Sequence, residues 1–392
     1  MDKQVLIAGG GIGGLAAALA CGRAGVPVQL FEQAEAFGEV GAGIQLGPNV
    51  TRVLHEHGLE RELAAVAAFP ACLRARQALD GETLGVLRLG PAMVERYGAP
   101  YATIHRADMH ALLLQAVRAD GQAELRLGQV VDTFEQTAQG VTLRFAAGPA
   151  VQGEALIGAD GLWSRVRTVL LADGLPRATG HLAYRALVSQ AELPPHLRST
   201  EVTVWLGPNL HAVQYPVRQG DALNVVIITH GRRVEAEPNR WDSVANAAEL
   251  RMKLSGVCAS LRELVEAIED WHLWMLCDRP PMRGAYEQAR GRVALLGDAA
   301  HPMRPYLAQG AAMAIEDAAE LGRCLVETAR DFPVALQRYA ERRWQRNARV
   351  QARSIRNGEI FHAQGLMRWG RDLSLRLLGE RLLDQPWLYG GR

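Results

Sequence analysis

The sequence contains few cysteines, and their arrangement excludes a disulfide-stapled scaffold. The five cysteines of the 392-residue chain are Cys21, Cys72, Cys258, Cys277 and Cys324. They form no CxxC pair, and an odd, scattered set does not make a disulfide framework. This usage favours a protein of the reducing cytoplasm, and we expect it to hold no metal.

The chain also lacks a surplus of either charge. Lysine and arginine together number 43 and aspartate and glutamate 42, so no global field would recruit nucleic acid or an anionic membrane. We therefore expect a small-molecule partner, with neither nucleic acid nor a membrane bound. The protein is expected to be a monomer or a homodimer.

Long uncharged apolar runs, internal repeats and low-complexity segments are also missing. No run of about eighteen apolar residues predicts a membrane span. The first core strand is predicted as early as Val5, so we expect no signal or transit peptide. Hydrophobic residues make up 48% of the chain, which is enough to bury a large core divided between two domains.

Glycine is concentrated near the start, in the stretch VLIAGGGIGGLAAALACGRAGVPVQLFEQ. The spacing Gly9-x-Gly11-x-x-Gly14 follows an apolar run and opens an alanine-rich one, as a strand, tight turn and helix require. Gly9 would adopt the turn, Gly11 would admit a pyrophosphate to the backbone, and Gly14 would let the helix pack on the strand. The N–H groups at the helix start would then bind the phosphates.

A second apolar strand, residues 26–31, ends at Glu32. Its distance from the loop, about twenty residues, is the offset at which a carboxylate binds the adenosine ribose in dinucleotide-binding folds. We therefore predict that Glu32 holds this ribose. A glycine-rich turn without a ligand is the weaker alternative, because strand, helix and acid occur together.

A glycine-punctuated loop follows and leads into a helix from about Pro48. Loops of this composition inside a compact domain tend to line ligands, so we expect Gln45 to contact the cofactor. Further predicted elements are hairpin strands within 72–88, a helix with Asp108 in its first turn, and strands near 124–127, 130–135 and 141–145.

From residue 180 to about 280 the pattern changes to alternating strands, which predict an antiparallel sheet inserted in the first domain. A helix near 245–268 and a strand at 271–276 close this insertion. From about Pro333 the chain is arginine-rich, and we interpret it as a solvated helix packed across the outside. The predicted fold class is α/β: a Rossmann-like domain with an inserted antiparallel-sheet domain and a C-terminal helix.

Two further motifs follow predicted strands. In VALLGDAAHP, the GD motif Gly297-Asp298 ends an apolar strand, and a helix from about Gly310 would direct its positive end at an anionic or electron-rich group. In GADGLWSRVR, the DG motif Asp160-Gly161 precedes a helix that carries Ser164 and Arg167. Each motif alone is equally compatible with a structural turn. Their occurrence together with the N-terminal loop indicates a nucleotide site.

This set of motifs resembles the single-component, class A flavoprotein aromatic hydroxylases, over nearly the whole chain. The resemblance implies that FAD occupies the N-terminal loop, that Asp298 binds the flavin ribityl chain, and that Asp160 touches FAD and the nicotinamide cofactor. Arg106 of HRADMHALLL matches the family's FAD-contacting arginine. The N–H groups of Gly310 and Ala311 would stabilise negative charge on the flavin N1/O2 edge. NAD(P)H would bind only transiently, as a co-substrate.

The order of the predicted elements also gives a domain organisation. We expect an FAD-binding domain from residues 1–72, 98–179 and 281–330, a substrate-binding sheet domain from 73–97 and 180–280, and a C-terminal helical segment from 331–392.

Within the family, WLGPNLHAVQYPVRQG and WHLWMLCDRPP look most like 3-hydroxybenzoate 6-hydroxylases, and salicylate and 6-hydroxynicotinate hydroxylases are near. The histidine and tyrosine matched by His211 and Tyr215 line the substrate pocket of those enzymes. Pro305 stands where they commonly carry glutamine, and HPMRPYLAQG is closer to the hydroxynicotinate type. The expected activity is hydroxylation of a small aromatic acid, for example 3-hydroxybenzoate to gentisate. Decarboxylative hydroxylation of salicylate or 6-hydroxynicotinate is the alternative.

The implied reaction uses NAD(P)H and O2 through a flavin C4a-hydroperoxide, which attacks an electron-rich ring carbon. A phenolate is more nucleophilic than a phenol, so the substrate hydroxyl needs an acceptor. We predict His211 in this role, since the ordinary histidine pKa of about 6.5 suits neutral pH. Strand alternation places Tyr215 on the same face, and Pro305 would fix a carbonyl near the flavin. Core packing remains the alternative for His211 and for Tyr215.

Two other function classes remain open. A flavin-free NAD dehydrogenase would leave the GD motif unexplained, and the yellow colour of a flavoprotein would exclude it. A flavoprotein that only binds or senses a ligand would not consume NADH in response to a substrate.

Overall fold

The chain forms two compact units in the computed structural model, which describes residues 4–38, 41–231 and 243–391. The first unit comprises Met1–Val40, Ala107–Arg177 and Cys277–Ile355. The second comprises Gly41–Arg106, Ala178–Leu276 and Arg356–Arg392. Residues 39 and 40 of the predicted glycine-rich loop lie outside the described residues.

The first unit contains a six-stranded sheet with five parallel strands. The strand order is β18 (Ala289–Arg290), β19 (Val293–Leu295), β11 (Ala155–Gly158), β1 (Val5–Ala8), β2 (Val28–Phe31) and β7 (Ala123–Arg126). Only the short edge strand β18 pairs antiparallel. The central strands β1 and β11 are fully buried, as expected for apolar strands covered on both faces.

Two alanine-rich helices pack against each other in this unit, α1 (Ile12–Arg23) and α9 (Gly310–Glu327). Small residues permit the close approach: a Cβ built on Gly322 of α9 would lie 3.1 Å from the carbonyl oxygen of Ala20. Helix α1 begins three residues before the predicted position, because two glycines of the loop belong to its first turn.

The remaining elements of the first unit surround this sheet. A small antiparallel sheet is formed by β8 (Val131–Gln136), β9 (Val141–Phe145) and β10 (Val151–Gly153). Helix α6 (Arg165–Leu171) follows β11, and α5 (Arg106–Asp120) begins directly after β6 and enters the unit at Ala107. The predicted strands of this region are confirmed to within one residue at each end.

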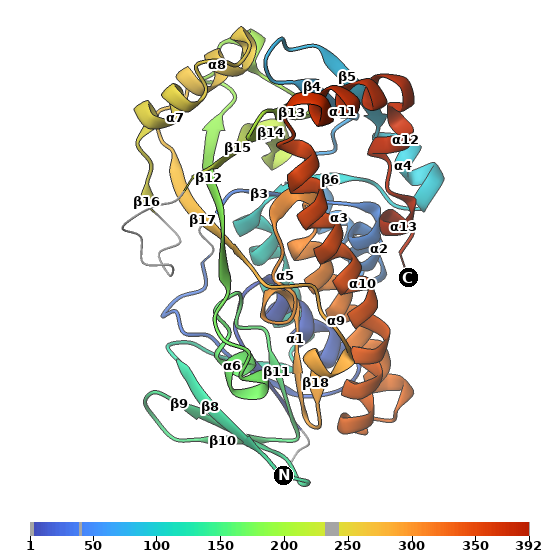
Figure 1. The fold of residues 1–392 in the computed structure, drawn as a ribbon. Coiled ribbons are helices and arrows are strands. Elements are labelled where there is room, and N and C mark those ends of the chain that lie inside the picture. Colours follow the sequence, from blue (N-terminus) through green and yellow to red (C-terminus); the bar gives the residue numbers. More distant parts are fainter. Residues whose placement is uncertain (1–3, 39–40, 232–242, 392) are drawn as a thin grey trace. The chain divides into compact units, whose positions relative to one another are not determined.

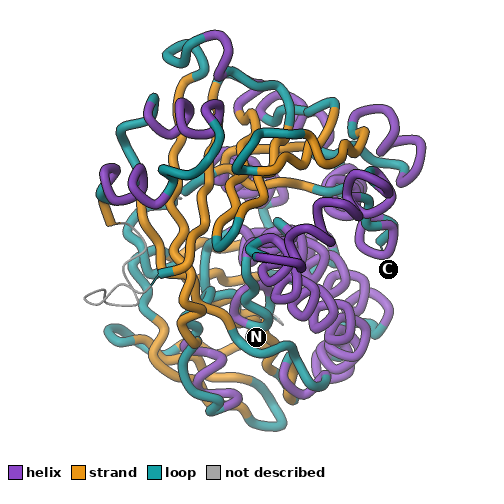
Figure 2. The backbone as a smooth tube through the Cα atoms, turned by 45° about the horizontal axis from the view of Figure 1, so that its top comes forward, coloured by secondary structure: helices purple, strands orange, loops and turns teal. Residues whose placement is uncertain are grey.

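The second unit is built on an eight-stranded sheet, and its long strands lie side by side in Figures 1 and 2. The order is β16 (Ser243–Val244), β17 (His272–Asp278), β12 (Arg177–Ser189), β15 (Ala222–His230), β14 (Leu210–Val217), β13 (Val202–Gly207), β4 (Cys72–Gln77) and β5 (Thr83–Arg88). Strands β16 and β17, β12 and β15, β15 and β14, β14 and β13, and β4 and β5 pair antiparallel, whereas β13 and β4 run parallel. The predicted antiparallel sheet and the hairpin within 72–88 are confirmed.

One face of this sheet is covered by α7 (Ala247–Lys253) and α8 (Ala259–Glu266), which lie near the end of β12 in Figure 1. Their apolar side chains join a buried core that includes Tyr184, Trp205 and Trp271. The single helix predicted near 245–268 was wrong. Gly256, a poor helix former, lies in the break, and the N–H of Cys258 donates instead to the carbonyl of Ala78.

Shorter elements complete the second unit. They are β3 (Gly43–Leu46), β6 (Ala102–His105), α2 (Pro48–Glu56), α3 (Glu60–Val66) and α4 (Gly90–Tyr97). Helix α2 begins at Pro48, as predicted, because proline fits the first helical position, where its missing N–H would have no partner.

The C-terminal region contains α10 (Phe332–Phe361), α11 (Gly365–Leu378), α12 (Glu380–Leu383) and α13 (Pro386–Tyr389). The prediction of a solvated helix holds for one face of α10, where Glu341, Arg342 and Arg349 are exposed. It was wrong for the other face, on which Arg343, Asn347, Gln351 and Ser354 are buried. Among the described residues, no helix is long and apolar enough to cross a membrane.

The α/β fold class is confirmed, with a parallel nucleotide-type sheet, a largely antiparallel sheet inserted in the chain, and helices at the C-terminus.

Candidate active site

The loop between β1 and α1 has the geometry that its glycine spacing predicts. Gly9 has a φ of +102°, and a Cβ built on it would lie 2.4 Å from the carbonyl oxygen of Ala159. A Cβ on Gly14 would lie only 1.8 Å from the carbonyl oxygen of Gly9. Both positions therefore require glycine, the first for the turn and the second for the approach of helix to strand.

The first turn of α1 offers backbone donors for an anion. The N-cap residue is Gly11, which has no side chain to accept from the N–H groups that follow. The carbonyl of Gly10 is held 2.8 Å from Nε2 of the buried His110. Free donors at the positive end of a 12-residue helix fit a pyrophosphate, so the residues present fit the dinucleotide that the loop predicts.

Glu32 lies one residue after β2, beside this loop. Its Oε2 accepts from the Gly10 N–H at 2.6 Å, and its Oε1 accepts from the Ala34 N–H at 2.9 Å. These two bonds orient a half-buried carboxylate that has about four acceptor positions. Two acceptor positions remain for ribose hydroxyls, which fits the predicted contact.

We expect Glu32→Ala to retain FAD about 10- to 150-fold less well, because a hydrogen bond to a charged group contributes about 1.5–3 kcal/mol. The measurement is the dissociation constant of FAD from reconstituted protein. Glu32→Gln keeps one carbonyl acceptor, so its affinity for FAD should lie between those of the parent protein and of Glu32→Ala. Tight, stoichiometric FAD in Glu32→Ala would remove Glu32 from the site.

The GD motif brings Asp298 close to the start of α9. Gly297 has a φ of +61° and opens the short 3₁₀ helix η4 (Gly297–Ala299), on which Asp298 is exposed. A Cβ built on Gly310, the first residue of α9, would lie 3.9 Å from Oδ1 of Asp298. An exposed carboxylate beside the N–H groups of Gly310 and Ala311 can bind hydroxyls and an electron-rich edge at the same place.

The DG motif has a capping role in the structure. Oδ1 of Asp160 accepts from the Ser164 hydroxyl at 2.5 Å, and its Oδ2 accepts from the N–H groups of Arg165 and Val166. Burial raises the pKa of Asp160, although these hydrogen bonds oppose the shift. The cofactor contact predicted for Asp160 stays a prediction, since three of its acceptor positions already serve α6.

Arg167 connects the DG and GD motifs. The sequence did not predict this connection. Its Nη1 donates to the carbonyls of Ala299 and Ala300, and its Nε and Nη2 donate to Asp173. The side chain is buried. Arg167 therefore holds the loop that carries Asp298 in register with α6.

A second buried network anchors the residues after the GD motif. Nε2 of His301 lies 2.5 Å from Oδ2 of Asp317, whose Oδ1 accepts from Arg343 and Asn347. Burial alone would raise the pKa of Asp317, but His301 and Arg343 hold it well below its usual range. His301 thus anchors this segment to Asp317. Arg343 of α10 is the buried cation that stabilises the Asp317 carboxylate.

Pro305 opens the 3₁₀ helix η5 (Pro305–Leu307) in this same segment. The segment is tied to α10 by Gln351, which donates to the carbonyl of Pro302, and by Ser354, which bonds the carbonyl of Arg304. Hydrogen bonds to α10 therefore hold the backbone on the N-terminal side of Pro305. Its role beside the flavin stays a prediction.

In the second unit, Gln45 and Tyr215 belong to one hydrogen-bonded group. Gln45, on β3, accepts from the buried Tyr101 hydroxyl at 2.5 Å. The Tyr215 hydroxyl donates to the carbonyl of Gly43 at 2.6 Å. Burial raises the pKa of Tyr215 well above its usual value, so this phenol stays protonated. Its observed partner is the backbone of β3, and the predicted substrate contact stays a prediction.

Arg106 is the first residue of α5, immediately after β6. Its N–H donates to the carbonyl of Ala42 at 3.2 Å, and its side chain is partly exposed. The family resemblance implies that Arg106 contacts FAD, and this contact stays a prediction.

His211 lies on β14 with the orientation that alternation predicts. Gln214 points to the opposite face, where it accepts from the indole of Trp205. Nδ1 of His211 lies 2.8 Å from Nε2 of His362, and the Phe361 ring packs edge-on at 5.4 Å between centroids. The sequence alone did not associate His362 with His211.

The electrostatic reason given for choosing His211 was wrong. Burial, with a smaller effect from His181, lowers the pKa of His211 to about 3. Burial also lowers the pKa of His362, to about 2. Both imidazoles are neutral at pH 7. His211 can therefore act as a neutral hydrogen-bond partner, whose tautomer is set by His362.

These two histidines should make the second unit sensitive to acid. Their folded-state pKa values lie below the unfolded value of about 6.5, so the unfolded chain binds more protons below that pH. Stability present above about pH 6.5 is lost as the pH falls, by about 1.4 kcal/mol per pH unit for each histidine.

We expect His362→Gln to lose less stability than the parent between pH 7 and pH 5, measured by urea unfolding. His272→Gln, on β17 of the same sheet, is the control and should keep the parent's pH dependence. Equal acid sensitivity of His362→Gln and the parent would show that His362 is not held neutral.

Comparison with known proteins adds the family. A family model described as "FAD binding domain" matches residues 2–354. The 3-hydroxybenzoate 6-hydroxylase of Polaromonas naphthalenivorans (strain CJ2) is 41% identical, over 99% of this chain and 96% of the relative. The 6-hydroxynicotinate 3-monooxygenase of Bordetella bronchiseptica is 36% identical, over 89% of each chain.

Two solved structures are similar over nearly the whole chain. A salicylate hydroxylase substrate complex has a TM-score of 0.82 and 29% identity, covering 99% of this chain and 95% of the other. HpxO of Klebsiella pneumoniae, complexed with FAD and uric acid, has a TM-score of 0.85 and 25% identity, covering 97% and 94%.

Proposed function

This chain belongs to the FAD-binding family of single-component aromatic hydroxylases, and we propose that it hydroxylates a small phenolic acid of the 3-hydroxybenzoate type. It is an FAD-dependent monooxygenase that uses NAD(P)H as a transient co-substrate. The proposed product is the dihydroxybenzoate with the new hydroxyl para to the first, which is gentisate.

The observation that carries this proposal is the similarity to 3-hydroxybenzoate 6-hydroxylases along nearly the whole chain, at 41% and 37% identity in two relatives. The position of His211 supports it. A neutral imidazole on the sheet face that also carries Tyr215 can accept from a phenol.

The first unit would hold FAD through its own residues. The first turn of α1 would bind the pyrophosphate, Glu32 the adenosine ribose, and Asp298 the ribityl hydroxyls. The N–H groups at the start of α9 would stabilise negative charge on the flavin ring. FAD, once reduced by NAD(P)H, would supply the chemistry that activates O2.

The second unit would prepare the substrate. His211 would orient the phenol and accept a hydrogen bond from its hydroxyl, which raises the electron density at the ring carbon to be attacked. The His362 hydrogen bond would fix which nitrogen of His211 carries a proton, and therefore whether His211 accepts or donates.

The alternative substrate class is a hydroxynicotinate, with loss of the carboxyl group. Pro305 and the surrounding stretch HPMRPYLAQG favour it, and a 6-hydroxynicotinate 3-monooxygenase is 36% identical to this chain. The two classes differ in a measurable product, because only the decarboxylating reaction releases CO2.

A substrate screen would test the proposal. Holoenzyme is mixed with NADH or NADPH and with 3-hydroxybenzoate, salicylate or 6-hydroxynicotinate, and both cofactor oxidation and product are measured. Gentisate from 3-hydroxybenzoate without CO2 supports the proposal. CO2 release with 6-hydroxynicotinate or salicylate as the best substrate would replace it by the alternative.

A further inference from the structure

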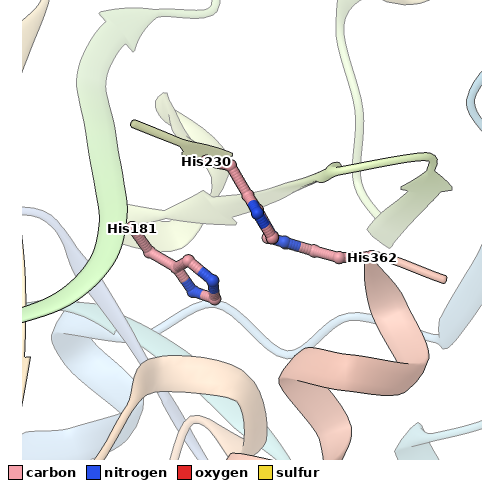
Figure 3. Close-up of side chains that lie close together, drawn as sticks. All are labelled: His181, His230 and His362. Carbon is pink, nitrogen blue, oxygen red and sulfur yellow. The ribbon is translucent and has the colours of Figure 1, made fainter. Parts of the chain in front are cut away.

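Three histidines converge in the second unit, as Figure 3 shows. His181 lies on β12, His230 ends β15, and His362 directly follows α10. His181 and His230 are direct partners in the antiparallel register of their two strands. Because the three come from elements 49 and 132 residues apart along the chain, no sequence motif announces the cluster.

The spacing of the rings suits a metal ion. One ring nitrogen from each histidine lies within 4.8 Å of the other two. The ring centroids are 4.5 Å apart for His181 and His230, 5.1 Å for His181 and His362, and 5.0 Å for His230 and His362. With Zn–N bonds of about 2.0–2.1 Å, tetrahedral ligands lie roughly 3.3 Å apart, so small ring rotations would complete the site.

The histidines are also accessible to an ion. Metal ions bind the neutral form of imidazole, which histidine commonly adopts near neutral pH. His181 and His362 are buried, whereas His230 is exposed. The exposed ring provides a route for an ion from solvent. The nearby cation, Arg371, is paired with Asp372 at 2.7 Å.

His362 also has the partner that a metal-bound histidine usually has. Its Nε2 lies 2.8 Å from Nδ1 of His211. A metal ligand commonly donates its second ring N–H to a neighbouring acceptor, which fixes the tautomer and orientation of the ring. Coordination through Nδ1 of His362 would place a proton on Nε2, directed at His211.

We propose that His181, His230 and His362 form a binding site for a divalent transition ion that prefers imidazole, Zn²⁺ in the first instance, with water in the fourth position. The ion would have a regulatory effect. A proton on Nε2 of His362 makes His211 accept through Nδ1 and carry its own proton on Nε2. His211 then presents a donor in place of an acceptor, so bound Zn²⁺ would inhibit hydroxylation. This consequence rests on the proposed role of His211, whereas the binding does not.

Isothermal titration of the FAD-loaded protein with Zn²⁺ tests the binding. We expect one Zn²⁺ per chain in the parent protein and no binding of Mg²⁺, which prefers oxygen ligands. Loss of an outer partner alone typically weakens metal affinity by about 10- to 100-fold, so loss of the ligand in His230→Gln should weaken it at least as much. His196→Gln is the matched control, since His196 is exposed and outside the cluster, and it should bind as the parent does.

The outcomes separate binding from function. One Zn²⁺ per chain, lost in His230→Gln and in His181→Asn but kept in His196→Gln, supports the site. No stoichiometric Zn²⁺ binding, or equal affinity in His230→Gln, overturns it. Inhibition by Zn²⁺ is then measured as product per NAD(P)H in the parent and in His230→Gln. Binding without inhibition would keep the site and refute the effect assigned to His211.

Discussion

His211→Ala should retain FAD and its reduction by NAD(P)H but hydroxylate about 10²- to 10⁴-fold more slowly, the usual contribution of a positioned acid–base group. His211 lies in the inserted sheet, so its removal leaves the loop between β1 and α1 and the GD motif intact. Without this hydrogen-bond acceptor, the phenol is not oriented and its ring is less electron-rich, so it reacts poorly. NAD(P)H would still be oxidised, and hydrogen peroxide would be released instead of product.

The measurement is product formed per NAD(P)H oxidised with the best aromatic acid. His272→Ala, a histidine of β17 in the same sheet, is the control and should keep the parent ratio. If His211→Ala also keeps that ratio, His211 only fills the core, and Tyr215 becomes the next candidate acceptor.

Gly14→Ala should yield protein with little bound FAD and reduced stability. Its Cβ would lie 1.8 Å from the carbonyl oxygen of Gly9, and this neighbour is backbone that cannot rotate away. Relief requires α1 to move from β1, which displaces the N–H groups that bind the pyrophosphate. Overpacking of this kind costs roughly 1–3 kcal/mol, and we expect the upper end of that range.

The matched control is Gly13→Ala, one residue earlier on the same helix. Its Cβ would meet only side-chain carbons, Leu296 Cδ2 at 3.0 Å and Ala314 Cβ at 3.5 Å. Two quantities are measured for both variants: the flavin-to-protein ratio after gel filtration, and the free energy of unfolding in urea. Full flavin content in Gly14→Ala would show that the loop tolerates a wider crossing and that the close approach is not needed for binding.

The nucleotide loop could be predicted because its requirements are local. A positive φ at Gly9 and a close approach at Gly14 can each be met only by glycine, so the residue type itself reports the backbone. The strands β7, β8 and β9 were equally readable, because period-two alternation and bounding turns are properties of short segments.

The role of α10 could not be read in this way. An arginine-rich helix predicts a solvated surface, and the partner that buries Arg343 is Asp317, 26 residues earlier on another helix. Nothing in the local pattern distinguishes Arg343 from exposed neighbours such as Arg342. The capping bonds of Asp160 were also missed, because the same Asp-Gly pair is compatible with a ligand contact and with a helix start.

The sequence predicted which face of β14 carries His211, but it did not predict the pKa of that side chain. Alternation along β14 places His211 and Gln214 on opposite faces of the sheet, whatever surrounds them. Its lowered pKa depends on burial and on His181, which lies on a different strand, β12. Long-range neighbours of this kind determine ionisation, and one sequence does not reveal them.

The most direct test of the central claim is the yield of hydroxylated product from 3-hydroxybenzoate per NAD(P)H oxidised by the yellow, FAD-loaded protein. We predict strong stimulation of NAD(P)H oxidation by this acid and gentisate as the product, approaching one per NAD(P)H. No stimulation by any hydroxybenzoate or hydroxynicotinate, or hydrogen peroxide as the sole product, would contradict the assignment as an aromatic acid hydroxylase.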